Sequence, residues 1–314
     1  MRRTLTLMAY LVLVSVSIFS ITGCAVLTSS QVDEIKRFSQ ATDAYTNLPG
    51  NLTRLYGELL RDSQLLDLSI EEFNTDDPLT AESAWNKIVV AYDSEQTFSQ
   101  LGNRMDTALH VLKIYSDLLG KLASDDYTES LDKSSERLGK SLREAIDTYN
   151  DNFRKDDPLP FININIARGA RLAGGLFLRY RQAQVLKDVI EKADPLVQEL
   201  MDDVREISNI MADNYKHYED DDLKVRFKNV AIEMGRLNTA TYTFVYNNIS
   251  RARAGQKLAE KVGKSATTYA SAHRALLNNT RIRMNIRGMI DQIQVLRNEI
   301  KAAKDIGKKL EKLD

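Results

Sequence analysis

The scarcity of proline does most to constrain what this chain can fold into. The chain has five prolines in 314 residues, and none follows Pro195. Strand and hairpin signals are nearly absent, and apolar residues recur at intervals of three and four, which places them on one face of a helix. The pattern predicts an all-α fold, an elongated bundle of long antiparallel helices with one buried stripe on each. Two such stripes consist of Ile88, Val89 and Tyr92, and of Leu109, Leu112, Tyr115 and Leu119.

Three prolines follow aspartate and predict helix starts, because aspartate caps a first turn and proline is tolerated at the first helical position. These pairs are Asp77-Pro78, Asp157-Pro158 and Asp194-Pro195. Adjacent like charges at Tyr218-Glu219-Asp220-Asp221-Asp222 predict a break between helices. We expect helices near residues 29–47, 51–73, 79–123, 126–152, 163–192 and 195–219, then one or two very long helices between 223 and 312.

The N-terminus has the layout of an export signal. Arg2 and Arg3 precede an uncharged, mostly apolar run that ends in Ile21-Thr22-Gly23-Cys24. These residues resemble the signal of the bacterial lipoprotein class, which ends in a lipobox: a leucine-like residue, a small residue, glycine or alanine, and cysteine. Ile21 and Thr22 depart slightly from the commonest form. The resemblance covers about the first 25 residues and implies cleavage between Gly23 and Cys24, acylation of Cys24 and attachment to a lipid bilayer.

A different interpretation of this segment is an uncleaved membrane helix, since a span needs about 20 apolar residues and no charge occurs between Thr4 and Val32. In the lipoprotein class the residue after the cysteine helps to sort the mature protein, and Ala25 is not the aspartate that favours inner-membrane retention. The resemblance therefore implies a cell-envelope protein on the outer membrane, facing the periplasm, in a Gram-negative host. In another host it implies the outer face of the cytoplasmic membrane.

The two parts of the mature chain carry opposite charge. Residues 24–223 contain 22 basic and 37 acidic residues, a net charge of −15, whereas residues 224–314 contain 19 basic and 7 acidic residues, a net charge of +12. Cys24 is the only cysteine, so packing alone must stabilise the mature protein. We expect a signal peptide (1–23), a lipid tether with the first helix (24–50), an acidic helical bundle (51–222) and a basic long-helix region (223–314) that packs on the bundle or on a partner.

The C-terminal region contains a heptad seam typical of a coiled coil. Its apolar residues are Ile282, Ile286, Met289, Ile293, Leu296, Ile300, Ala303 and Leu310, and Gly307 weakens it near its end. Basic residues flank the seam, and the candidate partner-binding residues are Arg283, Arg287, Arg297, Lys301 and Lys304. The first hypothesis is that this helix packs within its own chain, its basic edges against the acidic part. The second is an external acidic partner, which would be another subunit, an acidic envelope protein, anionic lipid head groups or an anionic glycan.

Nucleic acid is disfavoured as a partner, because export removes the chain from it and aromatic residues for base stacking are scarce in the basic part. No spaced metal or nucleophile motif occurs, so neither a metal nor another cofactor is expected. The acidic residues around His217 are interpreted as a solvated turn rather than an ion site. The chain has three histidines: His110, His217 and His273.

These features favour a membrane-anchored envelope lipoprotein that acts as a non-catalytic helical scaffold or accessory interaction subunit. The first alternative is a membrane-active protein, pore-forming or bilayer-perturbing, that exposes the glycine-rich segment 169–178 or the basic C-terminal helix to a bilayer. By default we interpret that segment as a close helix contact, and Tyr242, Phe244 and Tyr246 as core residues. The second alternative is an envelope hydrolase whose carboxylates converge only in the fold.

Overall fold

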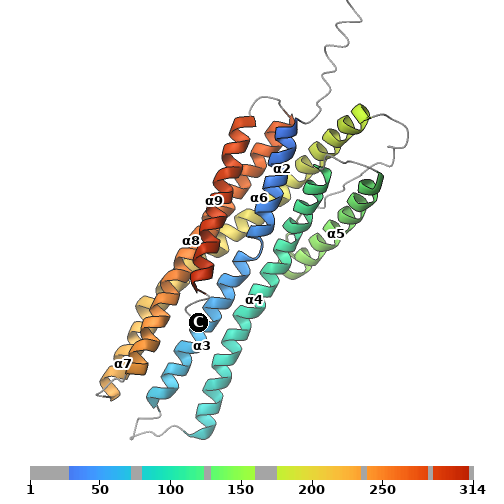
Figure 1. Ribbon diagram of the computed structural model, residues 1–314. Helices are drawn as coiled ribbons and strands as arrows, with labels where there is room; N and C mark the ends of the chain where they lie inside the picture. The colour runs from blue at the N-terminus through green and yellow to red at the C-terminus, as the bar shows by residue number, and fades with distance from the viewer. Residues whose placement is uncertain are drawn as a thin grey trace, which may run out of the picture.

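The computed structural model describes residues 28–71, 80–123, 129–159, 175–234, 239–281 and 286–310. These ranges are almost entirely helical and contain no strand, which confirms the all-α prediction. The helices form an elongated bundle in which long neighbours run antiparallel (Figure 1). They are α2 (Ser29–Tyr45), α3 (Leu48–Glu71), α4 (Ala81–Leu122), α5 (Glu129–Phe153), α6 (Gly175–His217), the π-helix η1 (Tyr218–Leu223), α7 (Lys224–Met234), α8 (Thr239–Arg281) and α9 (Ile286–Leu310).

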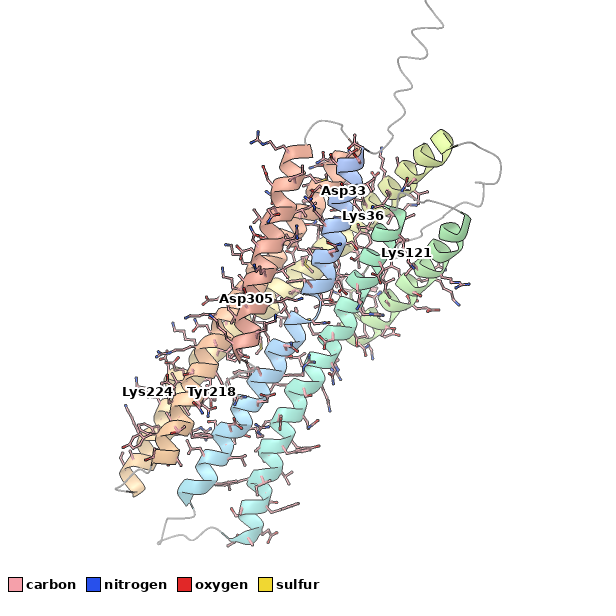
Figure 2. The ribbon with its side chains drawn as sticks, viewed as in Figure 1. Asp33, Lys36, Lys121, Tyr218, Lys224 and Asp305 are labelled. Carbon is pink, nitrogen blue, oxygen red and sulfur yellow. The ribbon has the colours of Figure 1, made fainter. Side chains whose placement is uncertain are left out.

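The bundle has two distinct ends, which we call the α2 end and the distal end. Helix α2 begins at one end, and α8 reaches this end before α9 turns back from it (Figure 1). The last turns of α3, the first turns of α4, helix α7 and the first turns of α8 lie at the opposite, distal end. Figure 2 shows the same separation in side chains, with Asp33 and Lys36 towards the α2 end and Lys224 towards the distal end.

Helix α2 has a well-defined start. The Thr28 hydroxyl accepts a hydrogen bond from the backbone N–H of Gln31 (3.2 Å), and the Gln31 side chain accepts one from the backbone N–H of Thr28 (2.9 Å). This reciprocal capping box satisfies two N–H groups that a helix start otherwise leaves without partners. The N-cap Thr28 therefore lies four residues after Cys24, and the helix begins at the next residue.

The interior is apolar but crossed by tyrosine hydroxyls that join separate helices. Tyr45 donates to the carbonyl of Val262 (3.2 Å), Tyr215 donates to the carbonyl of Leu52 (2.7 Å), and the hydroxyls of Thr42 and Tyr269 are 2.8 Å apart. Burial raises the pKa of the Tyr45 and Tyr215 hydroxyls well above the ordinary value. Each ring thus adds apolar area to the core while its polar tip finds a partner.

Two predicted interruptions between helices do not occur. Pro195 lies inside α6, so the helices expected at 163–192 and 195–219 are a single helix from residue 175 onwards. The Asp194 carboxylate does not cap a helix start; it accepts hydrogen bonds from the Gln198 amide (3.2 Å) and from His273 (2.9 Å). Tertiary packing of a long apolar face has overridden the local cost of proline.

The acidic run at residues 218–222 does not break the chain into separate helices either. It forms η1, which continues directly from α6 into α7. Two partners relieve the expected repulsion: Arg253 binds Glu219 (2.9 Å), and His217 binds Asp221 (2.7 Å). Tyr218 and Leu223 are buried, which holds both ends of this segment on the core.

The region 223–312 is divided into α7, α8 and α9 rather than one or two helices. The heptad seam lies in α9, where Met289, Ile293, Leu296, Ile300, Ala303 and Leu310 are buried. Helix α9 packs with this seam on α8 and α2, so the apolar part of the first hypothesis, packing within the chain, is confirmed.

Candidate functional site

Several predicted positions lie outside the described residues. They are Gly23 and Cys24 at the expected cleavage site, Arg283 among the candidate partner-binding residues, and most of the glycine-rich segment 169–178. Lipidation, signal cleavage and the four-part division of the chain stay predictions. The other four candidate partner-binding residues lie on α9.

These four α9 residues are turned towards solvent. Arg287, Arg297, Lys301 and Lys304 are exposed, and Lys308 is exposed beside them. Among the described residues none of the five forms an ion pair, so the other part of the first hypothesis, which placed the basic edges of this helix against the acidic part of the chain, is wrong for these residues. Helical spacing of four, three and four places Arg297, Lys301, Lys304 and Lys308 on one face, and we call these four residues the basic stripe. Asp305, labelled in Figure 2, lies at the edge of this face.

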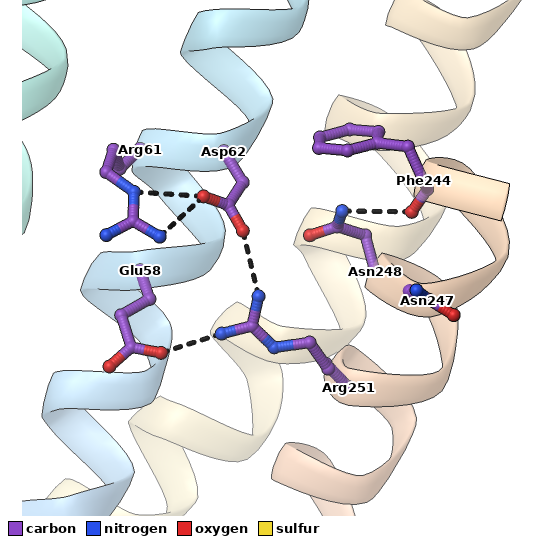
Figure 3. Close-up of a pocket in the computed structure, with 7 residues that line it drawn as sticks. All are labelled: Glu58, Arg61, Asp62, Phe244, Asn247, Asn248 and Arg251. Carbon is purple, nitrogen blue, oxygen red and sulfur yellow. Dashed lines mark hydrogen bonds and ion pairs between the residues drawn. The ribbon is translucent and has the colours of Figure 1, made fainter. Parts of the chain in front are cut away.

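The basic and acidic parts of the chain instead form ion pairs deeper in the bundle, at Arg251 of α8. Its side chain is 9% exposed, and its guanidinium donates to Glu58 (2.6 Å) and Asp62 (2.8 Å) of α3. Arg61 donates to the other oxygen of Asp62 (2.9 Å) and to Glu95 of α4 (2.8 Å). Figure 3 shows Glu58, Arg61 and Asp62 of α3 meeting Arg251 of α8.

This cluster borders a pocket of about 340 Å³ that Phe244, Asn247 and Asn248 complete. It is the place where the hydrolase hypothesis would need a free acid and base. Glu58 and Asp62 both accept hydrogen bonds from Arg251, so both carboxylates are already engaged by one guanidinium. The geometry supports a structural role, in which one buried cation fixes α8 against α3.

A second polar group in the core was missed at the sequence level. His273 is completely buried, its Nε2 is 2.7 Å from the Tyr115 hydroxyl, and its Nδ1 is 2.9 Å from the Asp194 carboxylate. Neutral imidazole with its proton on Nδ1 satisfies both contacts, donating to Asp194 and accepting from Tyr115. Burial lowers the pKa of His273, and the hydrogen bond from His273 lowers the pKa of Asp194. Because His273 has no exposed surface, this triad joins α4, α6 and α8 rather than meeting a substrate.

The largest departure from the sequence prediction is at the distal end. Ile88, Val89 and Tyr92, expected in a buried stripe, are exposed, and so are Tyr242 and Tyr246, which were expected in the core. Residues two apart on a helix point about 200° away from each other, so Tyr242, Phe244 and Tyr246 cannot all face inwards; Phe244 is the one that packs on the core.

Exposed large apolar side chains gather at this end of the molecule. Trp85 is 65% exposed, Tyr246 70% and Ile232 78%. Among the described residues, ten of the twelve large apolar side chains that are exposed lie at the distal end, and the other two are Ile210 and Val295. We call these ten the distal apolar end: Leu65, Trp85, Ile88, Val89, Val90, Tyr92, Val225, Ile232, Tyr242 and Tyr246.

The described residues offer neither a metal site nor a membrane-spanning helix. Within the described ranges, no cluster of three or more histidine, cysteine, aspartate or glutamate side chains is arranged to hold a metal ion. The described helices include none with the length and apolarity to cross a membrane. No family model, curated protein or solved structure matches the chain.

Proposed function

We propose that this protein is an envelope lipoprotein that acts as a non-catalytic helical scaffold, with a lipid anchor at the α2 end and a partner-binding surface at the distal end. The single observation that carries the proposal is the position of the distal apolar end, on the far side of the bundle from the start of α2.

The anchor follows from the lipobox-like string together with chain connectivity. Four peptide units link Cys24 to Thr28, and an extended chain advances at most about 3.5 Å per residue, so the acylated cysteine must act within about 14 Å of the start of α2. Two or more acyl chains are sufficient for stable anchoring. The bilayer would therefore hold the molecule at the α2 end.

The distal apolar end has the composition of a protein-binding surface. Monomeric proteins rarely expose contiguous apolar patches beyond a few hundred Å² without an interaction to cover them. Tryptophan and tyrosine are the residues that most often dominate binding energy, and this end exposes Trp85, Tyr92, Tyr242 and Tyr246. The first turns of the long helix α4 carry both Trp85 and Tyr92.

A test is quantitative mass spectrometry of proteins cross-linked to the lipoprotein in its own envelope. The variant Trp85→Gln, Ile88→Gln, Tyr92→Gln should fold, because all three side chains are largely exposed, and should lose a specific envelope protein that the wild type captures. The matched control is Ile210→Gln, Val295→Gln, which changes exposed apolar residues elsewhere. Capture of the same proteins by all three forms would contradict the proposal.

Exposed apolar residues also favour a second candidate function, perturbation of a bilayer by the distal end. Trp and Tyr prefer the membrane interface, and four such residues are exposed here. Release of a dye from vesicles by the wild type, abolished in the triple glutamine variant, would support this function. A scaffold should leave such vesicles intact.

A further inference from the structure

The basic stripe of α9 has no role in the scaffold proposed above. Its apolar seam is already used against α8 and α2, so what α9 offers to the outside is charge alone. Four cations, Arg297, Lys301, Lys304 and Lys308, lie within twelve residues, or about 16 Å of helix, and Arg287 adds a fifth towards the α2 end.

We propose that the basic stripe docks on the anionic lipid head groups of the membrane that holds the anchor, so that the bundle lies along this membrane instead of standing on it. The proposal rests on the anchor of the proposed function, because only a tether at the α2 end brings α9 within reach of the bilayer. It assigns to α9 a lipid partner rather than a protein.

Charge complementarity supports this choice of partner. An anionic leaflet attracts clustered lysine and arginine side chains as a diffuse plane of charge, which requires no shaped groove. The attraction extends over a Debye length, about 8 Å at physiological salt. Exposed cations that have no carboxylate partner among the described residues are free of the competition that internal ion pairs would impose.

The chemistry of the stripe disfavours a protein partner. Protein interfaces have an apolar centre and are depleted in lysine, whereas three of the four stripe residues are lysines. The apolar residues of α9 that a partner helix would need are buried within the chain. The distal apolar end, where aromatic residues are exposed, is the surface that suits a protein.

Trp85 provides a natural probe of orientation, since it is the only tryptophan in the chain and is exposed at the distal end. Ser39 of α2 lies against Ser116 of α4 (2.8 Å), and from this contact the helices run ten residues to the start of α2 and thirty-one residues to Trp85. At 1.5 Å per residue these distances place Trp85 about 60 Å from the α2 end. In a bundle that lies flat, Trp85 is separated from the membrane by at most the bundle's thickness, a few helix diameters of about 10 Å each.

The experiment measures energy transfer from Trp85 to a dansyl-labelled lipid, with the full mature lipoprotein reconstituted in vesicles of phosphatidylcholine alone or mixed with phosphatidylglycerol. We expect transfer in the anionic vesicles, and a loss of most of it in neutral vesicles and in 1 M salt, where the Debye length is about 3 Å. The variant Arg297→Glu, Lys301→Glu, Lys304→Glu, Lys308→Glu should lose it too. A control with the same charge change elsewhere, Lys155→Glu, Lys187→Glu, Lys216→Glu, Lys257→Glu, should keep it, because these lysines are exposed away from α9, Lys155 just after α5 and the other three on α6 and α8.

Three outcomes would overturn the proposal. Equal transfer in neutral vesicles and in the stripe variant would show that the distal apolar end itself meets the bilayer. Absence of transfer in every vesicle would show that the bundle stands away from the membrane. An acidic protein would then be the better candidate partner for the basic stripe. Loss of transfer in the control as well would show an effect of net charge alone.

Two further measurements keep these outcomes interpretable. Circular dichroism checks that the stripe variant is folded, and Arg297→Gln, Lys301→Gln, Lys304→Gln, Lys308→Gln replaces it if it is not. Flotation with the vesicles tests the anchor separately, because every acylated form should float whatever its orientation. Failure of the wild type to float would contradict the proposed function and not the stripe.

Discussion

The imidazole of His273 is fully buried and yet has a partner for each ring nitrogen, which makes it the clearest case of one residue constraining the bundle. Burying an apolar residue of similar volume would cost less free energy, but it would leave the Tyr115 hydroxyl and the Asp194 carboxylate without this partner. Three helices meet at this residue, so its contacts help to fix their relative rotation. The cost of charging it makes the stability of the fold depend on pH.

We expect the protein to lose stability as the pH falls from 7 to 5. Burial gives folded His273 a pKa below the ordinary value of about 6.5, so the unfolded chain takes up this proton first and unfolding becomes more favourable. The loss has a slope of at most about 1.4 kcal/mol per pH unit for one group. Asp194, whose pKa is lowered, contributes above its unfolded pKa of about 3.9 and loses its contribution only in stronger acid.

Urea unfolding of the wild type and of His273→Gln at pH 7 and pH 5 measures this effect. The variant should be less stable at pH 7 but should lose less stability between the two pH values. His110→Gln is the control, because His110 is exposed and lies on the same helix as Tyr115. An unchanged pH dependence in His273→Gln would assign the loss to other groups.

Helices α3 and α4 approach each other more closely than side chains on both would allow. A Cβ added to Gly102 would lie 2.8 Å from the carbonyl oxygen of Gly50 and 2.8 Å from the Thr53 hydroxyl, and one added to Gly57 would lie 2.8 Å from the Phe98 Cβ. Real Cβ atoms essentially never come this close, so these glycines permit the contact. The distal part of α4, which carries Trp85, depends on this pairing.

Gly102→Ala should therefore destabilise the protein, by about 1–3 kcal/mol, because the helices must shift to accept the methyl group. Gly307→Ala is the matched control, since nothing lies within 4 Å of its added Cβ, and alanine should stabilise this helix interior by about 0.5–1 kcal/mol. Chemical denaturation of both variants gives the free energies of unfolding. A neutral Gly102→Ala would mean that α3 and α4 separate at little cost.

The elements that sequence reasoning located correctly are those in which local and tertiary preferences agree. The heptad of α9 and the stripe from Leu109 to Leu119 have regular apolar spacing, and both are buried. The helix start predicted at Pro195 was wrong, because the free-energy cost of a proline inside a helix is local and the packing of a long helix can outweigh it. The exposure of Ile88 and Tyr92 could not be predicted from the sequence, since periodicity identifies an apolar face but not whether another helix covers it.

The polar core shows the same limit for sites. Asp194 and His273 are 79 residues apart and Arg251 is 189 residues from Asp62, so no local sequence pattern could predict either contact. The opposite charges of the two halves did indicate that pairing would occur, and Arg251 and Arg253 confirm it for two residues. The exposed stripe on α9 follows directly from helical spacing.

At the scale of the whole molecule, the proposed anchor makes one further prediction. A Cys24→Ser protein should lack acyl chains, and its signal should not be processed at Cys24. Metabolic labelling with a fatty acid, combined with the mass of the mature N-terminus, measures both. The control Thr28→Ala should leave acylation intact and weaken only the start of α2, by about 1 kcal/mol, because the capping hydroxyl is lost.

If Cys24→Ser remained an integral membrane protein of the same mass as the wild type, the uncleaved membrane helix would be the correct interpretation of the N-terminus. The scaffold would then keep its orientation but not its lipid. Both interpretations attach the chain to a membrane at the α2 end, so the distal apolar end is presented in the same direction.

The π-helical segment η1 allows the helix to hold one extra residue without rotating the distal end. Its hydrogen bonds span five residues, whereas those of an α-helix span four, so one more residue is wound into about the same total turn. Deleting one residue from the run Asp220–Asp222 would therefore allow an uninterrupted α-helix and would leave Val225 and Ile232 on nearly the same face. A second deletion could not be absorbed in this way. Each residue of an α-helix turns the chain by about 100°, so that second deletion would rotate α7 by this angle and redirect both side chains with no substitution in either.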